Sequence, residues 1–241
     1  MNPVRTFSAT KAAFFRAYPR PIHSVYRRVV EELLVELHLT TVNSAFVYDP
    51  FFALGLVTLY DGLMEAYQPP EQREKIFEAL CKSLQLKPEV LRKNARDLLE
   101  LMRSGEPGQR LQLLCLQPEA EDVGGLKAIL ERMTHPPYAY SRVLAVGLYT
   151  AYEEVARTIY TDVEERTRRF LQDVVGKLSF SSERVKKDLE LYRNSLDRMK
   201  QARAVVEEMV KAARRQQERR QSTATLPETS TADPGEPRKL N

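Results

Sequence analysis

The three histidines and two cysteines of this chain are the side chains best suited to hold a metal ion or to act as nucleophiles. A di-iron helical bundle needs a Glu-x-x-His motif, because one helical turn then brings both ligands to the same metal. The residues three positions before the histidines are Arg20, Val35 and Arg132, so this motif is absent. The histidine spacing fits no zinc pattern, and Cys81 and Cys115 cannot complete one. We therefore expect no metal site, and we expect both cysteines, which lie on apolar helical stripes, to be core residues.

No other catalytic constellation is evident in the sequence. The glycines in residues 105–108 do not form a phosphate-binding loop and are better interpreted as a turn. Glu31, Glu32 and Glu36 lie near arginines on one predicted helix, which indicates a solvated, ion-paired face. His38 ends the same helix, where a protonated imidazole would interact favourably with the helix dipole. We therefore predict a protein that is not an enzyme and that binds no cofactor.

The best candidate site is a concentration of positive charge near the N-terminus. The first thirty residues contain six arginine and lysine side chains and no aspartate or glutamate. Four aromatic residues lie between these charges: Phe7, Phe14, Phe15 and Tyr18. Aromatic side chains beside cations suit an anionic membrane surface or an acidic protein groove, whereas no nucleic-acid-binding motif accompanies the charge. The candidate partner-binding or lipid-binding patch, which we call the basic face, consists of Arg16, Arg20, Arg27 and Arg28. A merely solvated face is the alternative.

Helices are predicted to position these residues. In residues 18–39 the apolar side chains recur with the 3.6-residue period of an amphipathic helix. Proline marks the start of the following helices. Asp49 and Pro50 pair an N-cap with a proline at the first helical position, and Pro70 and Pro88 open two more helices.

The remaining pattern also favours an all-α fold. Residues 141–159 are nearly apolar on all sides in their first half, which predicts a helix at the centre of a bundle. Thr161 and Glu164 have the spacing of a capping box for a helix over residues 163–178. No run of alternating β-branched residues predicts a strand. The longest apolar runs reach only seven residues, well short of the roughly 20 that a membrane-spanning helix needs.

Beyond residue 176 the composition changes to that of one long, charged helix. Residues 177–226 contain no glycine or proline, and half of residues 183–220 are charged. Apolar residues recur there in alternating steps of four and three, interrupted by Arg203, which is typical of a coiled-coil seam. The predicted seam consists of Val185, Leu189, Tyr192, Leu196, Met199, Val206 and Val210.

Two interpretations of this long helix remain open. In the first interpretation, the helix packs on the bundle of its own chain. In the second, it forms a coiled-coil-like arm that serves recognition, and a chain ending at Ser181 would then still fold. From residue 221 onward the polar, proline-containing composition predicts disorder. The predicted domains are a helical bundle at 1–178, a long charged coiled-coil-like helix at 179–220 and a disordered tail at 221–241.

Five long stretches match one known family, in the same order along the chain. They are RTFSATKAAFFRAYPRPIHSVYRRVVEELLVELHL from Arg5, YDPFFALGLVTLYDGLMEAY from Tyr48, IFEALCKSL from Ile76, YSRVLAVGLYTAYE from Tyr140 and KDLELYRNSLDRMKQA from Lys187. On these stretches the chain resembles the thylakoid formation protein family of oxygenic phototrophs. The resemblance extends from about residue 3 to residue 215, whereas residues 98–123 look divergent.

The resemblance implies an all-helical, non-enzymatic protein with a C-terminal coiled-coil segment. It implies a peripheral position at the cytoplasmic (stromal-equivalent) face of the thylakoid membrane and a role in photosystem II biogenesis and repair. The implied partners are an FtsH-type membrane protease complex, photosystem II components and the membrane surface, and no nucleic acid is expected. The alternative is a basic helical regulator that binds nucleic acid or anionic lipid, which the net charge of +4 permits.

Overall fold

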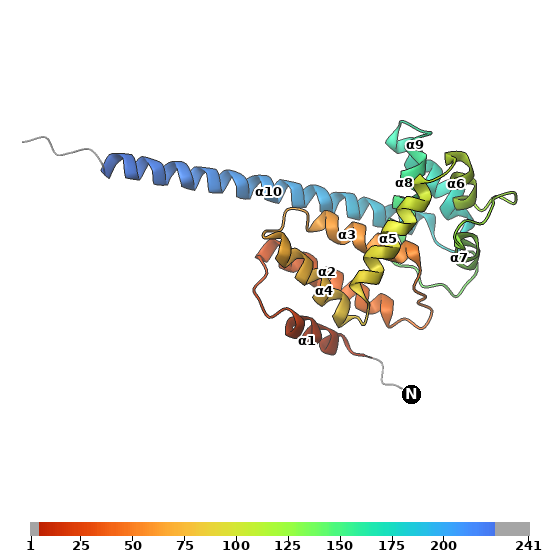
Figure 1. Ribbon diagram of the computed structural model, residues 1–241, viewed down its shortest axis with the longest axis horizontal. Helices are drawn as coiled ribbons and strands as arrows, with labels where there is room; N and C mark the ends of the chain where they lie inside the picture. Colours follow the sequence, from red (N-terminus) through yellow and green to blue (C-terminus); the bar gives the residue numbers. More distant parts are fainter. Residues whose placement is uncertain (1–4, 225–241) are drawn as a thin grey trace, which may run out of the picture. The chain divides into compact units, whose positions relative to one another are not determined.

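Every regular element in the described part of the computed structural model is a helix (Figure 1). The structure describes the backbone of residues 5–224 and the side chains of residues 5–202 and 204. For these residues the predicted all-α class is confirmed. The chain divides into two compact units, Met1–Met199 and Lys200–Asn241, so the first unit extends beyond the bundle predicted to end at residue 178.

The first unit contains nine α-helices, a π-helical turn, a 3-10 turn and the beginning of α10. In chain order these are α1 (Phe7–Ala17), α2 (Ser24–Thr41), α3 (Pro50–Leu63), α4 (Pro70–Ser83), α5 (Pro88–Arg103), α6 (Pro107–Leu114), α7 (Leu126–Met133), α8 (Arg142–Ala156), α9 (Val163–Arg169), the π turn (Phe170–Val174), the 3-10 turn (Val175–Lys177) and α10 (Ser182–Ala224). Residues 221–224 of the predicted tail belong to α10, and residues 225–241 lie outside the described part.

The predicted helix starts are largely confirmed. Pro50, Pro70 and Pro88 each occupy the first turn of a helix, and the Asp49 carboxylate accepts a hydrogen bond from the Phe52 backbone N–H at 2.9 Å. The capping box predicted for the later helix is wrong.

That helix is capped by Asp162, whose carboxylate accepts hydrogen bonds from the backbone N–H groups of Glu164 and Glu165. A carboxylate is the stronger acceptor at the positive end of the helix dipole, so it replaces the hydroxyl of Thr161 as the cap. The helix also ends at Arg169, where the π turn begins, and does not continue to residue 178.

The core is organised around the crossing of α3 and α8. A Cβ atom on Gly55 would lie 1.8 Å from the Val143 carbonyl oxygen, and one on Gly147 would lie 1.8 Å from the Phe51 carbonyl oxygen. The two backbones therefore touch, and a side chain at either glycine would separate them. All residues from 143 to 148 are buried, which confirms that this segment lies at the centre of the bundle.

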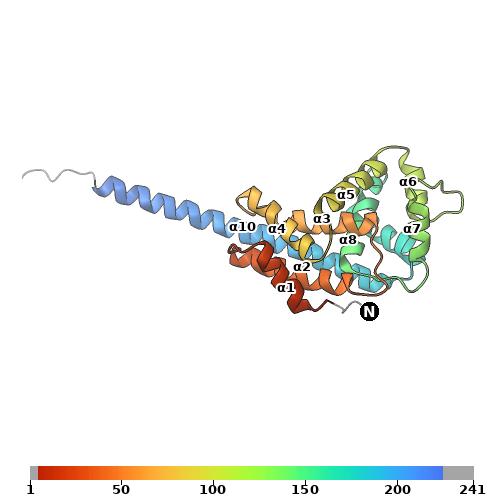
Figure 2. The same cartoon turned by 60° about the horizontal axis from the view of Figure 1, so that its bottom comes forward.

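Helix α1 packs against α4 and α2 (Figures 1 and 2). The Thr10 hydroxyl lies 3.0 Å from His38 Nδ1, and the Phe7 ring meets the imidazole edge-on, with 5.6 Å between the ring centroids. Thr10 and His38 are both buried. Burial, and secondarily the positive charge of Arg5, lowers the pKa of His38. The imidazole therefore packs as a neutral core group, contrary to the prediction of a cation favoured by the helix dipole.

We expect Gly55→Ala and Gly147→Ala each to lower the free energy of unfolding by about 3 kcal/mol or more, because overpacking here acts on backbone atoms that cannot rotate away. Urea unfolding followed by far-UV circular dichroism measures the change. Gly176→Ala is the matched control, since its nearest new contact would be an ordinary 3.6 Å from the Leu171 carbonyl oxygen. Equal stability of all three variants would contradict the close crossing.

We expect acidification to destabilise the packing of α1 through His38. The folded pKa lies below the unfolded value of about 6.5, so the stabilisation is complete above pH 6.5 and is lost as the pH falls through the folded pKa. Urea unfolding between pH 7 and pH 5 should show a steeper loss in the native chain than in His38→Gln, whose amide does not titrate. Identical pH profiles would show that His38 does not couple protonation to folding.

Candidate functional site

The four arginines of the basic face are all exposed, but they differ in their partners. Arg27 lies 3.4 Å from Glu31 and Arg28 lies 2.9 Å from Glu32, each one turn apart on α2. Within the described residues, Arg16 and Arg20 make no ion pair. The unbalanced charge of the basic face therefore lies at the end of α1 and in the loop that follows it.

The aromatic residues between these charges turn inward. Phe14 and Tyr18 are buried, while Phe7 and Phe15 are partly buried and pack against the core. The Tyr18 hydroxyl donates a hydrogen bond to Gln72 Oε1 on α4 at 3.0 Å. These rings help to hold α1 on the bundle. Lys11 Nζ lies 6.0 Å from the centre of the partly buried Phe15 ring, so a surface that combines cations with aromatic rings stays a prediction.

The predicted seam on α10 divides between the two units of the chain. Val185 and Leu189 are core residues, and three further seam residues pack against the core: Tyr192, Leu196 and Met199. A Cβ atom on Gly62 of α3 would lie 3.0 Å from Leu196 Cδ2, so this part of α10 packs closely on α3.

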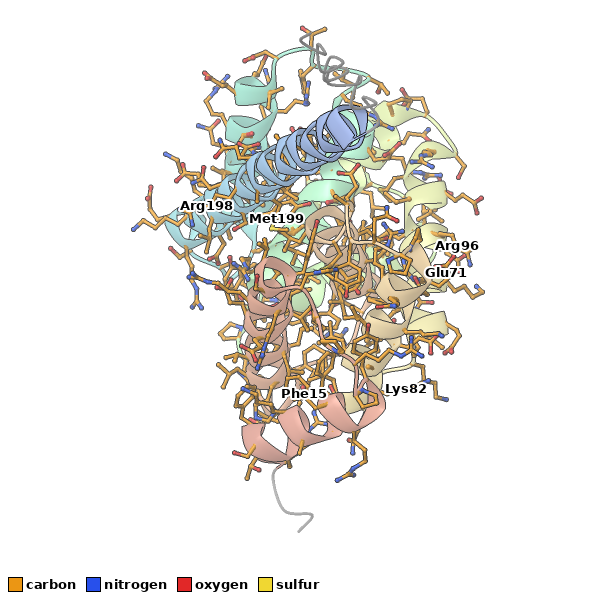
Figure 3. The ribbon with its side chains drawn as sticks, turned by 90° about the vertical axis from the view of Figure 1, so that its left-hand side faces the viewer. Phe15, Glu71, Lys82, Arg96, Arg198 and Met199 are labelled. Carbon is orange, nitrogen blue, oxygen red and sulfur yellow. The ribbon has the colours of Figure 1, made fainter. Side chains whose placement is uncertain are left out.

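The near end of α10 therefore packs on its own bundle, as one of the two interpretations predicted. In Figure 3, Met199 lies on the side of α10 that faces the bundle, whereas Arg198 points away from it. The side chains of Val206, Val210 and Arg203 lie outside the described residues, so the far half of the seam stays a prediction.

A hydrogen-bond network also fastens α10 to α8 and α9. Arg193 donates to the Tyr149 hydroxyl at 2.8 Å and to the Thr167 hydroxyl at 2.9 Å. Tyr149 in turn donates to Glu153 at 2.7 Å, and Arg166 donates to the same carboxylate at 3.0 Å. Sequence reasoning missed this network, because none of these residues is distinguished by its spacing from ordinary helix-surface charges.

Glu36 departs from the predicted solvated face of α2. Its side chain is only 19% exposed and pairs with Arg142 at the start of α8. Burial raises the pKa of Glu36, although the Arg142 guanidinium opposes the shift. Glu31 and Glu32 do form the predicted exposed ion pairs.

The buried groups with reactive chemistry are poorly suited to catalysis. Cys81 and Cys115 are buried and unpaired, and burial raises their pKa values to about 12 and about 11. Both therefore remain protonated thiols near pH 7 and are weak nucleophiles. Within the described residues no group of three or more histidine, cysteine, aspartate or glutamate side chains could hold a metal ion. The same part of the chain contains no helix that is both long and apolar enough to span a bilayer.

Comparison with known proteins identifies one matching family model, close relatives and a similar solved structure. The family model described as thylakoid formation protein matches residues 6–221. Protein Thf1 of Synechococcus sp. (strain JA-2-3B'a(2-13)) is 85% identical over 237 residues, which cover 98% of this chain and 99% of that protein. Protein Thf1 of Cyanothece sp. (strain PCC 7425 / ATCC 29141) is 41% identical and covers 96% of this chain and 98% of its own length. The solved structure of Psb29 is similar with a TM-score of 0.75 at 38% identity, covering 88% of this chain and 98% of that one.

We expect the double variant Arg16→Gln, Arg20→Gln to bind anionic lipid vesicles more weakly than the native chain. Each basic side chain near an anionic surface contributes on the order of 1 kcal/mol to binding, and the contribution falls as salt is added. Vesicle sedimentation at low and high salt measures the loss.

The control is Arg96→Gln, Arg198→Gln, which removes the same charge from exposed positions on α5 and α10 (Figure 3). Equal loss in both double variants would show that net charge alone decides binding. Unchanged binding of the first would leave Arg16 and Arg20 as solvated side chains.

Proposed function

Because this chain belongs to the thylakoid formation protein family, we propose that it is a non-enzymatic adaptor in thylakoid biogenesis and in photosystem II assembly and repair. It acts with FtsH-type membrane proteases, which remove damaged subunits, and with photosystem II components. The observation that carries the proposal is the family match over residues 6–221, which includes both the bundle and most of α10.

The chemistry of the buried groups supports an adaptor better than an enzyme. The thiols of Cys81 and Cys115 are protonated near pH 7. The largely buried ionisable side chains form ion pairs that join helices, namely Arg142 with Glu36 and Arg166 with Glu153. An adaptor needs surfaces, and the chain offers an unbalanced cationic surface at Arg16 and Arg20.

The proposed position is peripheral, at the cytoplasmic face of the thylakoid membrane, and the cationic surface at Arg16 and Arg20 supports electrostatic attachment there. The aromatic rings of α1 serve the core, so attachment is electrostatic and salt-sensitive. A protein held in this way is released by high salt, whereas an inserted one needs detergent.

Partner recognition is assigned to residues from Lys200 onward. The near half of the α10 seam packs against the bundle, and Val206 and Val210 are the remaining residues of the seam predicted from the sequence. A coiled-coil seam of this kind would engage the protease complex or a photosystem II subunit, one partner at a time.

A basic regulator that binds nucleic acid is the second candidate. The net charge of +4 permits it, but two of the four arginines in the basic face are already paired with carboxylates. Binding of the native chain to duplex DNA with a steep salt dependence would favour this candidate over the adaptor.

We expect a chain ending at Met199 to fold and melt cooperatively but to capture less protease and photosystem II protein than the full chain. Affinity capture from solubilised thylakoid membranes, followed by identification of these partners, is the measurement. The control ends at Ser181 and removes Val185 and Leu189 from the core, at a cost of on the order of 4 kcal/mol.

The control should therefore be unstable, contrary to the sequence-based expectation that a chain ending at Ser181 would fold. Undiminished capture by the chain ending at Met199 would place recognition on the bundle. Failure of the full chain to capture either partner would contradict the adaptor function.

A further inference from the structure

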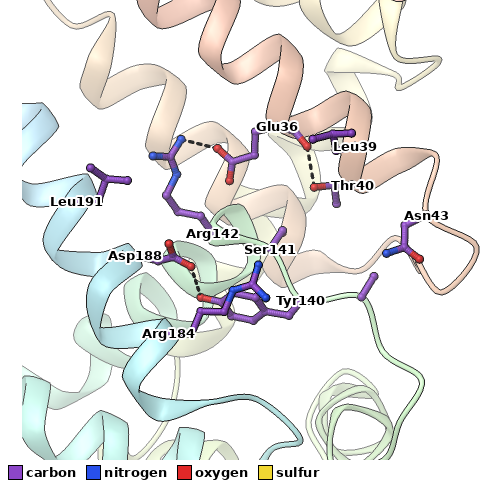
Figure 4. A pocket seen from close by; sticks show the side chains of 11 residues that line it. Glu36, Leu39, Thr40, Asn43, Tyr140, Ser141, Arg142, Arg184, Asp188 and Leu191 are labelled. Carbon is purple, nitrogen blue, oxygen red and sulfur yellow. Dashed lines mark hydrogen bonds and ion pairs between the residues drawn. The ribbon is translucent and has the colours of Figure 1, made fainter. Parts of the chain in front are cut away.

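A pocket of about 400 Å³ lies between α2, the segment that precedes α8 and the near end of α10 (Figure 4). Its charged wall is built by Glu36 of α2, Arg142 of α8, and Arg184 and Asp188 of α10. The Tyr140 ring forms part of the same wall. All of these residues belong to the first compact unit.

Each of the two carboxylates of the pocket already has one hydrogen-bond donor. Glu36 pairs with the Arg142 guanidinium. Asp188 accepts a hydrogen bond from the Tyr140 hydroxyl at 2.6 Å. Figure 4 shows both side-chain contacts as dashed lines. A ligand with hydrogen-bond donors would have to compete with these contacts.

The two arginines, by contrast, have donors to spare. The Arg184 guanidinium lies 4.8 Å from the centre of the Tyr140 ring, and its N–H groups have no acceptor among the described residues. Arg142 Nε is buried and has no hydrogen-bond partner. An unpaired buried donor costs free energy, whereas the donors of the exposed Arg184 are the ones that a ligand in the pocket can reach directly. Unused N–H donors beside occupied carboxylates favour a ligand that supplies acceptor oxygens.

Two exposed leucines complete the pocket. Leu39 of α2 is 63% exposed and Leu191 of α10 is 46% exposed, and both line the cavity. An apolar group bound there would gain about 25 cal/mol for each Å² of apolar surface removed from water. The pocket therefore combines arginine donors with an aliphatic wall.

We propose that this pocket binds a carboxylate carried on an aliphatic group, with Arg184 as the principal donor and Leu39 and Leu191 around the aliphatic part. A planar carboxylate matches the paired donors of a guanidinium. A doubly charged phosphate would meet greater repulsion from Glu36 and Asp188 than a singly charged carboxylate does. The ligand is the C-terminus of a peptide that ends in an aliphatic residue, or a free aliphatic acid.

The test uses the full chain and the ¹H–¹⁵N resonances of the arginine Nε groups, titrated with N-acetyl-L-leucine. Saturable shifts of the Arg184 and Arg142 resonances are expected. N-acetyl-L-leucinamide, which lacks the charge, and acetate, which lacks the aliphatic part, should cause much smaller shifts. Hexanoate distinguishes the source: equal binding indicates any aliphatic acid, whereas weaker binding indicates a peptide C-terminus.

Arg184→Gln should weaken binding roughly tenfold, because one charge-assisted hydrogen bond contributes at least 1.5 kcal/mol. Arg198→Gln is the matched control, since it removes the same charge from an exposed site on the same helix outside the pocket. Arg184 is exposed, so its substitution should leave the fold intact, and thermal unfolding checks this.

No shift of either arginine resonance with N-acetyl-L-leucine would overturn the proposal. Equal weakening by Arg184→Gln and Arg198→Gln would also overturn it, as would tighter binding of inorganic phosphate than of both aliphatic acids. Vesicle binding by Arg184→Gln should match that of Arg198→Gln, so the pocket and the basic face are tested separately.

Discussion

The backbone contact between α3 and α8 at Gly55 and Gly147 is the constraint on which the rest of the bundle depends. With no side chain at either position, the two helices approach until Cβ atoms would collide with carbonyl oxygens. This approach buries α8 in its first half and fixes where its polar residues emerge. Arg142 then meets α2, and Tyr149 meets Arg193 of α10. A wider crossing would displace both contacts.

The near half of α10 is consequently part of the bundle. Val185 and Leu189 complete the core, Leu196 packs on α3 beside Gly62, and Arg193 ties the helix to α8 and α9. The same helix supplies Arg184, Asp188 and Leu191 to the pocket against α2. The boundary between the two compact units falls after Met199, so the near half of α10 belongs to the same unit as the bundle.

Local sequence signals predicted much of this fold. Prolines at the first turn fixed three helix starts, and an unbroken apolar segment identified the central helix, because both effects act within one element. The signals failed where the partner of a side chain decides its role. The aromatic rings of α1 and Glu36 have ordinary amphipathic spacing, yet Phe14, Tyr18 and Glu36 turn toward other helices. A heptad pattern also does not show whether the apolar seam packs on the bundle of the same chain or on a second chain.

Native-state hydrogen exchange of residues 182–199 tests most directly whether the near half of α10 belongs to the cooperative core. If it does, amides in this segment exchange with the same opening free energy as those in the centres of α3 and α8. Gly147→Ala should then lower the protection of all three segments by the same amount. Much weaker protection of residues 182–199, unaffected by Gly147→Ala, would contradict the account and show that α10 docks as an independent element.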